Sequence, residues 1–167
     1  MKSYVEINAK NLVHNLTQFH KLTGKPLMFV VKANAYGHGL EETVDITRHL
    51  DFIGCYAVDA VEEALAVHRK APGKNILVIG WMDNDQLEQA IENDFEMVAP
   101  SLDYLDEVET VAAKLDRTAR VHLKIETGTA RMGMKPHDAI DIYTKTQWQP
   151  SLHVKVTGLY SHFANIE

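Results

Sequence analysis

The chain has 167 residues, of which 46% are hydrophobic and 24% are charged, with a net charge of −6. This composition is typical of a globular protein with a domain-sized core. No run of Lys and Arg with interleaved aromatics occurs, so we expect no nucleic-acid partner. The N-terminal segment is too polar for a signal peptide, and no apolar run is long enough to span a bilayer. A single cysteine, Cys55, excludes an internal disulfide and favours a cytoplasmic location.

Short apolar runs rich in β-branched residues recur along the chain. Most are apolar on successive residues, which is typical of parallel strands that are covered on both faces. The predicted strands are Leu27–Val31, Phe52–Val58, Ile76–Gly80, Glu96–Ala99, Val121–Ile125 and Val154–Tyr160. Tyr4–Ile7 is short and polar, and is a candidate strand of a different sheet.

The segments between these runs have apolar residues at helical spacing. The predicted helices are Ala9–Leu22, Leu40–Leu50, Ala60–Lys70, Asp85–Asn93, Leu102–Leu115 and Pro136–Thr144. Ser101 is expected as the N-cap of one helix, and Pro136 stands at the start of another. Strict alternation of strand and helix predicts an α/β fold with a parallel sheet. A doubly wound sheet is disfavoured because no G-x-G-x-x-G turn follows the first strand, which favours about six β/α units of a partial (β/α)8 barrel.

Lys32 directly follows the first predicted strand, where catalytic groups of parallel barrels gather. A partly desolvated amine at such a position is a nucleophile toward aldehydes. Asn34, Gly37 and Gly39 then predict a loop with unusual backbone angles, which can present N–H groups and the Tyr36 hydroxyl to a phosphate. The residues alone also allow a solvated lysine and a packing tyrosine on a plain α/β scaffold.

The segment VVKANAYGHG, residues 30–39, resembles the pyridoxal-phosphate (PLP) attachment signature of alanine racemases. Three further segments resemble the same family in the same order: YVEINAKNLVHNL at 4–16, LKIETGTARMGM at 123–134 and GLYSHFANIE at 158–167. The resemblance covers essentially the whole chain but about half of a typical family member. It implies that residues 1–167 are an incomplete N-terminal PLP-binding barrel domain, without the family's C-terminal β-domain.

The resemblance also implies a role for each matching residue. Lys32 would be the Schiff-base lysine and the acid/base on one face of the substrate Cα. Tyr36 would bind the cofactor phosphate, and Arg131 would contact the phenolic oxygen of the cofactor and the substrate. Lys124 matches a lysine that is often carbamylated, and His162 matches a histidine near the pyridine ring. With Gly128 between Lys124 and Arg131, we expect a turn to bring these two together.

The implied activity is the interconversion of L- and D-alanine, as in D-alanine biosynthesis for peptidoglycan precursors, by a homodimer of the full-length protein. The second base would be a tyrosine of the partner's C-terminal domain, so we expect this fragment alone to be inactive. Without the rest of a barrel, the six units would leave unpaired edges, so we expect either a longer native protein or association of copies. The histidines show no metal-binding spacing, and no metal site is expected.

Two departures from the family pattern leave the substrate open. Glu126 stands where the family usually has Asp, and Thr129-Ala130 stands where it usually has Met-Gly. Loss of that glycine restricts the backbone before Arg131, so a serine racemase or a racemase of broad specificity remains an alternative. So do a related amino-acid decarboxylase, which should lack YGHG, and a PLP-binding barrel protein without racemase activity.

Overall fold

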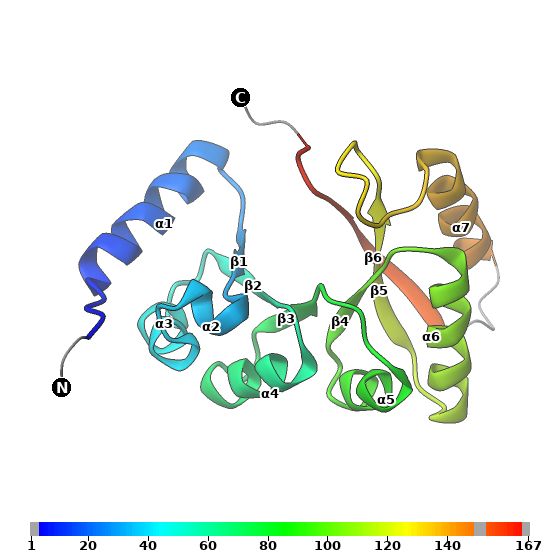
Figure 1. Ribbon diagram of the computed structural model, residues 1–167, viewed down its shortest axis with the longest axis horizontal. Coiled ribbons are helices and arrows are strands. Elements are labelled where there is room, and N and C mark those ends of the chain that lie inside the picture. The colour runs from blue at the N-terminus through cyan, green and yellow to red at the C-terminus, as the bar shows by residue number, and fades with distance from the viewer. Residues whose placement is uncertain (1–3, 149–152, 165–167) are drawn as a thin grey trace. The chain divides into compact units, whose positions relative to one another are not determined.

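A computed structural model describes residues 4–148 and 153–164 of the chain. Six strands alternate with helices (Figure 1). The described residues group into two compact units, Met1–Ile79 and Gly80–Glu167, which are called unit 1 and unit 2. Unit 1 contains α1 (Ala9–Thr23), β1 (Leu27–Val30), α2 (Lys32–Tyr36), α3 (Leu40–Thr47), β2 (Ile53–Val58), α4 (Val61–Lys70) and β3 (Asn75–Val78). Unit 2 contains α5 (Asn84–Glu92), β4 (Glu96–Ala99), α6 (Leu102–Lys114), β5 (Ala119–Ile125), α7 (Pro136–Trp148) and β6 (Val154–Ser161).

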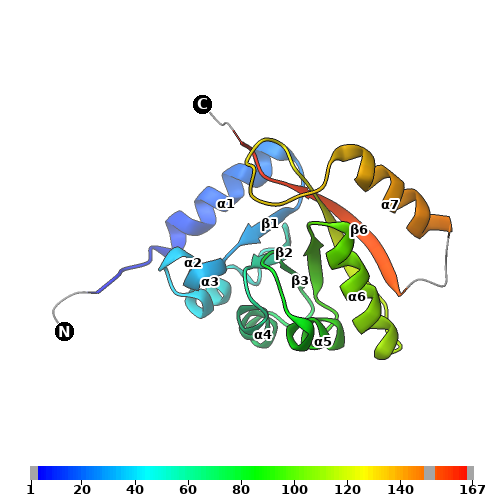
Figure 2. The ribbon, with the colours of Figure 1, turned by 45° about the vertical axis from the view of Figure 1, so that its right-hand side comes forward.

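The sheet of unit 1 is parallel: β1 pairs with β2, and β2 pairs with β3. The central strand β2 is almost entirely buried, as its run of successive apolar residues predicts. Helices α3 and α4 lie side by side (Figure 2). Each directs its apolar face inward, so that Val44 on α3 and Val61 and Val67 on α4 are completely buried.

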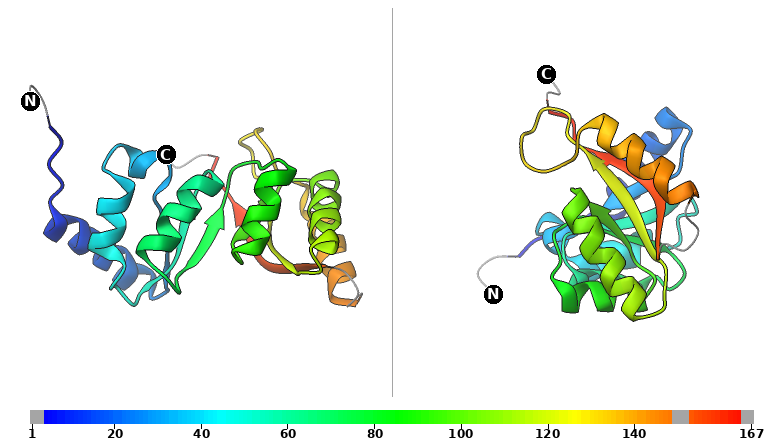
Figure 3. Two further views of the ribbon diagram at one scale, coloured as in Figure 1. Left: turned by 90° about the horizontal axis from the view of Figure 1, so that it is seen from below. Right: turned by 90° about the vertical axis from the view of Figure 1, so that its right-hand side faces the viewer.

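The sheet of unit 2 is parallel as well, with β5 between β4 and β6. The expected apolar stripe of α6 is buried, including Leu105, Val108 and Ala112. Ser101 is the N-cap of α6, since its hydroxyl accepts a hydrogen bond from the Tyr104 amide at 3.2 Å, and Pro136 begins α7. Helix α7 runs along β5 and β6 (Figure 3).

A cluster of charged and titratable side chains joins β4 and β5 in unit 2. Glu96 on β4 and His122 on β5 are 7% and 8% exposed. The His122 Nε2–H donates to Glu96 Oε2 at 2.9 Å, because an ionised carboxylate can only accept. The Arg120 guanidinium binds the other carboxylate oxygen of Glu96. The hydrogen bond from His122 and the charge of Arg120 hold the pKa of Glu96 below its ordinary value.

Gly158 on β6 makes room for this cluster. It lies opposite His122 in the strand register, and a β-carbon at position 158 would stand 2.6 Å from the His122 ring. That distance is far below van der Waals contact, so the imidazole occupies space that only glycine leaves open at this position.

The predicted strands and long helices are all present, with ends that differ by a few residues. Residues 4–8 form no regular structure, so Tyr4–Ile7 is not a strand of the described fold. Helix α2 was not expected. Residues 165–167 of the segment that resembles the family's sixth strand lie outside the described residues. The prediction of one domain over 1–167 stays a prediction. Among the described helices, none has the length and apolar character that a membrane span requires.

Candidate functional site

Lys32 stands at the carboxyl end of β1, as the sequence predicts. The preceding Val31 is completely buried, and its amide donates to the Ala57 carbonyl at 2.8 Å, which fixes the backbone beside β2. The Lys32 side chain is one third exposed, and its Nζ lies 3.1 Å from Asp59 Oδ1. Asp59 directly follows β2, so the amine and the carboxylate emerge from the same ends of two paired parallel strands.

The residues after Lys32 form a left-handed helical turn. Ala33, Asn34, Ala35 and Tyr36 have φ values of 52, 54, 52 and 55°. Each such residue with a β-carbon costs about 1–2 kcal/mol relative to right-handed backbone. The surrounding contacts must offset this strain, which is typical of functional loops.

One carboxamide, that of Asn34, and one carboxylate, that of Glu63, hold the turn in place. The Asn34 side-chain oxygen accepts the Leu40 amide at 2.8 Å and so joins the turn to the start of α3. Glu63 on α4 accepts the Asn34 amide at 3.3 Å with one oxygen and the Asp59 amide at 2.9 Å with the other. One carboxylate therefore fixes both loops that carry the Lys32–Asp59 pair.

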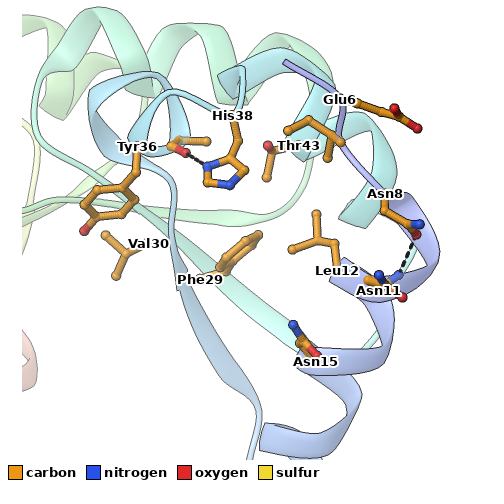
Figure 4. Close-up of a pocket in the computed structure, with 12 residues that line it drawn as sticks. Glu6, Asn8, Asn11, Leu12, Asn15, Phe29, Val30, Tyr36, His38 and Thr43 are labelled. Atoms are coloured by element: carbon orange, nitrogen blue, oxygen red, sulfur yellow. Dashed lines mark hydrogen bonds between the residues drawn. The ribbon is translucent and has the colours of Figure 1, made fainter. Parts of the chain in front are cut away.

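A cavity of about 410 Å³ lies beside the turn, among α1, β1, α2 and α3 (Figure 4). Phe29, Leu12 and Thr43 line it, together with Tyr36 and His38. Tyr36 is 63% exposed, whereas the His38 ring is fixed by a 2.9 Å hydrogen bond between Nδ1 and the Ala35 carbonyl. Lys32 is not among the lining residues, so the cavity is adjacent to the predicted attachment point rather than at it.

Lys124 lies near the end of β5 and is 7% exposed. Its Nζ stands 5.3 Å from the centre of the Tyr160 ring, and Tyr160 is its partner in the register of β5 and β6. An ammonium group over an aromatic face is attracted by the negative charge of the π system. The Met134 amide donates to the Lys124 carbonyl at 2.8 Å, which closes the loop that carries Arg131.

Arg131 is exposed in the loop between β5 and α7. Glu126 organises this loop, because its carboxylate accepts the amides of Gly128 and Ala130 and the Thr129 hydroxyl. These backbone hydrogen bonds, that of Gly128 foremost, lower the pKa of Glu126. Glu126, at a position where the sequence departs from the family pattern, is thus the residue that shapes the Arg131 loop.

Ala130 has a φ of 51°, in the region that favours glycine. We therefore expect Ala130→Gly to raise the free energy of unfolding by about 0.5–1 kcal/mol, because relief of strain exceeds the entropy that glycine adds to the unfolded chain. Urea unfolding followed by circular dichroism measures the change. The matched control is Ala113→Gly on the exposed face of α6, which should lower the free energy of unfolding by about 1 kcal/mol. A similar decrease for Ala130→Gly would show that the backbone at Ala130 is not strained.

His162 follows β6 and is exposed. The Thr127 hydroxyl donates to the His162 carbonyl at 2.7 Å and lies 2.8 Å from the Ser161 hydroxyl. Thr127 therefore ties the loop that carries Arg131 to the segment that carries His162.

The structure thus places every predicted site residue at or after the carboxyl end of a strand. Lys32 and Tyr36 share one turn of unit 1, and the segments of Arg131 and His162 are joined in unit 2. Lys124 packs against Tyr160 within the sheet, while Arg131 is exposed in the following loop. The contact with Tyr160 was not predicted from the sequence, and neither were the roles of Asp59 and Glu63. No cluster of three or more His, Cys, Asp or Glu suited to a metal ion occurs in the described part of the chain.

Residues 7–167 match the sequence profile of one family, "Alanine racemase, N-terminal domain". The chain belongs to this family. Its α/β architecture, with six parallel strands alternating with helices, corresponds to the N-terminal barrel of alanine racemase. The predictions of the family and of the fold class are confirmed.

Relatives and solved structures agree on the extent of the match. Alanine racemase 2 of Caldanaerobacter subterraneus subsp. tengcongensis is 32% identical over 165 residues, which are 96% of this chain and 41% of the relative. The Methanococcus maripaludis alanine racemase is 29% identical over 98% of this chain and 44% of its own. The alanine racemase structure from Oenococcus oeni has a TM-score of 0.82 at 26% identity, covering 96% of this chain and 46% of that one. The chain therefore spans less than half the length of the alanine racemases it matches.

Proposed function

We propose that this chain provides the lysine-bearing part of an alanine racemase active site and binds PLP through Lys32. The observation that carries the proposal is the placement of the Lys32 amine at the carboxyl end of a buried parallel strand. It is followed there by a left-handed turn that no run of ordinary residues adopts without compensation. Both features belong to a chain of the alanine racemase N-terminal domain family.

The residues present fit the cofactor. Lys32 offers an amine that is one third exposed and can therefore be reached by an aldehyde. Tyr36 offers an exposed hydroxyl for a phosphate oxygen, and Arg131 offers an exposed guanidinium for an anionic oxygen. His162 and Lys124 complete the set that the family resemblance assigns. We propose that Lys32, Tyr36, Arg131 and His162 hold the cofactor.

When bound, PLP supplies an electron sink for the negative charge that develops on the substrate Cα. The chain's own contribution is to hold Lys32 Nζ where it accepts and returns the Cα proton on one face. Racemisation needs a second acid/base on the opposite face. We propose that this group comes from the C-terminal part of a partner subunit, so that the whole protein acts on alanine as a homodimer in D-alanine synthesis for peptidoglycan.

The substrate itself is not fixed by these residues. Glu126 and Thr129-Ala130 depart from the family pattern in the loop that carries Arg131, and on that ground serine or a broader set of amino acids is an alternative substrate. A PLP-binding protein without racemase activity is the second candidate, because the Lys32 amine at the end of β1 would serve to attach the cofactor in either case. Comparing D- and L-alanine with D- and L-serine as substrates of the whole protein separates these alternatives.

Cofactor binding is tested with the chain as it exists. PLP is added, the absorbance between 350 and 450 nm is recorded, and borohydride then fixes the linkage for peptide mass analysis. We expect a visible band and a reduced cofactor on the peptide that contains Lys32. Absence of the label from that peptide would overturn the proposal.

For the 167-residue chain alone we expect no racemisation above the level of PLP free in solution, because we propose that the second acid/base comes from the C-terminal part of a partner subunit. The measurement is the exchange of the Cα proton of L-alanine with D₂O, together with formation of D-alanine on a chiral column. Turnover comparable to that of a full-length alanine racemase would show that this chain holds both acid/base groups.

A further inference from the structure

We propose that Asp59 is the counter-charge of the Lys32 nitrogen, a role that rests on the proposed attachment of PLP to Lys32. The ammonium Nζ and the carboxylate Oδ1 are 3.1 Å apart, and this hydrogen-bonded ion pair joins the end of β1 to the end of β2. Asp59 thus touches the one atom of the chain that bonds to the aldehyde.

The backbone of Asp59 is held in place by a hydrogen bond that does not involve the Asp59 side chain. Glu63 accepts the Asp59 amide at 2.9 Å, and its other oxygen accepts the Asn34 amide at 3.3 Å. The backbone on both sides of the ion pair is therefore held by a single group on α4. Because Glu63 binds the Asp59 backbone, replacing the Asp59 side chain leaves this support in place.

Other titratable groups near the pair are engaged elsewhere or point away from it. Both oxygens of Glu63 bind backbone amides, and the His38 ring is bonded to the Ala35 carbonyl. Glu42 on α3 lies against Gly39. The Tyr36 ring lines the cavity of Figure 4 and is largely exposed. Asp59 is therefore the carboxylate that faces Nζ in the described part of unit 1.

The Asp59 carboxylate is an opposite charge in direct contact with the Lys32 nitrogen, and the attraction between the two is what we propose Asp59 contributes. If Lys32 held PLP, the same charge would stay beside the nitrogen, where it would stabilise a positive charge and so favour replacement of the lysine by the amine of a substrate. No bond is made or broken by Asp59 itself, and its contribution is the charge it places beside Nζ.

The first test needs no cofactor. The variants Asp59→Asn and Asp51→Asn each remove one negative charge, at opposite ends of β2. An N-hydroxysuccinimide acetate ester acetylates Lys32 in each protein at pH 7.5, and exposed Lys10 in the same digest is the internal reference. Because the ion pair is exposed, we expect Asp59→Asn to react about two- to fivefold faster than the unmodified chain. Asp51→Asn should match the unmodified chain. Equal rates in the two variants would overturn the proposal.

The second test uses PLP and separates the two hypotheses. The visible absorbance of each cofactor-loaded protein is titrated with base. We expect the protonated band of Asp59→Asn to be lost about 0.2–0.7 pH units earlier than that of the unmodified chain. If the unmodified chain forms no band, the proposed function fails, while the acetylation result still decides the Lys32–Asp59 interaction. If a band forms and both variants titrate together, the counter-charge role of Asp59 is wrong and the proposed function stands.

Discussion

Replacing Lys32 with Ala is expected to reduce covalent labelling by PLP and borohydride to the level of exposed lysines such as Lys10. The reason is that an aldehyde requires a primary amine, and Lys32 is the amine that the end of β1 presents. The visible band should vanish together with the label. Absorbance and peptide mass analysis measure the two effects independently.

Two further variants make this result specific. Lys32→Arg keeps a positive charge beside Asp59 but has no nucleophilic amine, and it should lose the label as completely as the Ala variant. Lys25→Ala removes an exposed lysine at the opposite end of β1 and should keep the label. Normal labelling of Lys32→Arg would show that the cofactor is attached elsewhere.

Replacing Glu96 with Ala is expected to lower the free energy of unfolding by about 3 kcal/mol. The substitution leaves the His122 ring and the Arg120 guanidinium without their buried partner, and an uncompensated buried charge costs about 3–5 kcal/mol. The lower end applies because Arg120 keeps its 3.1 Å ion pair with Asp94. Urea unfolding measures the loss. Glu92→Ala on the exposed side of α5 is the control and should change the free energy by about 0.5 kcal/mol or less.

The same cluster predicts a loss of stability in acid. Because the folded-state pKa of Glu96 lies below its ordinary value of 4.5, the unfolded chain binds more protons as the pH falls toward that value. The stabilisation is complete above the unfolded pKa and is lost as the pH falls through the folded pKa. In Glu96→Ala, the acid-dependent loss of stability below about pH 5 should be smaller than in the unmodified chain. Curves of equal slope would assign the acid dependence to other carboxylates, such as Asp45 and Glu126, whose pKa values are also lowered.

The strands and the long helices were predictable because the burial of one or both of their faces determines the spacing of apolar residues in the sequence. The run of successive apolar residues in β2 and the helical spacing of Leu105, Val108 and Ala112 on α6 each follow from which faces are covered. Asn34, Gly37 and Gly39 predicted unusual backbone angles after Lys32, but nothing in the sequence predicted positive φ values at Ala33, Ala35 and Tyr36. Alanine and tyrosine favour right-handed backbone, and their left-handed conformation here is imposed by contacts with Glu63 and the start of α3.

Prediction of the site succeeded where position along a strand was enough. Lys32 was predicted because it follows a buried strand. Asp59 follows the next strand and could have been predicted by the same rule. Glu63 was out of reach, because its role depends on two backbone amides from different loops. The contact between Lys124 and Tyr160 depends on the register of β5 and β6, which no local pattern specifies.

The glycine opposite His122 also has a consequence for how the last strand joins the sheet. If β6 slipped by one residue along β5, Thr157 or Leu159 would face the imidazole, and the β-carbon of either would occupy the ring's place. A slip by two residues would bring Val156 or Tyr160 there, with the same collision. Steric overlap with the imidazole therefore disfavours shifted registers of β5 and β6. It sets which side chains of β6 meet the end of β5, and hence that Tyr160 rather than a neighbour receives Lys124.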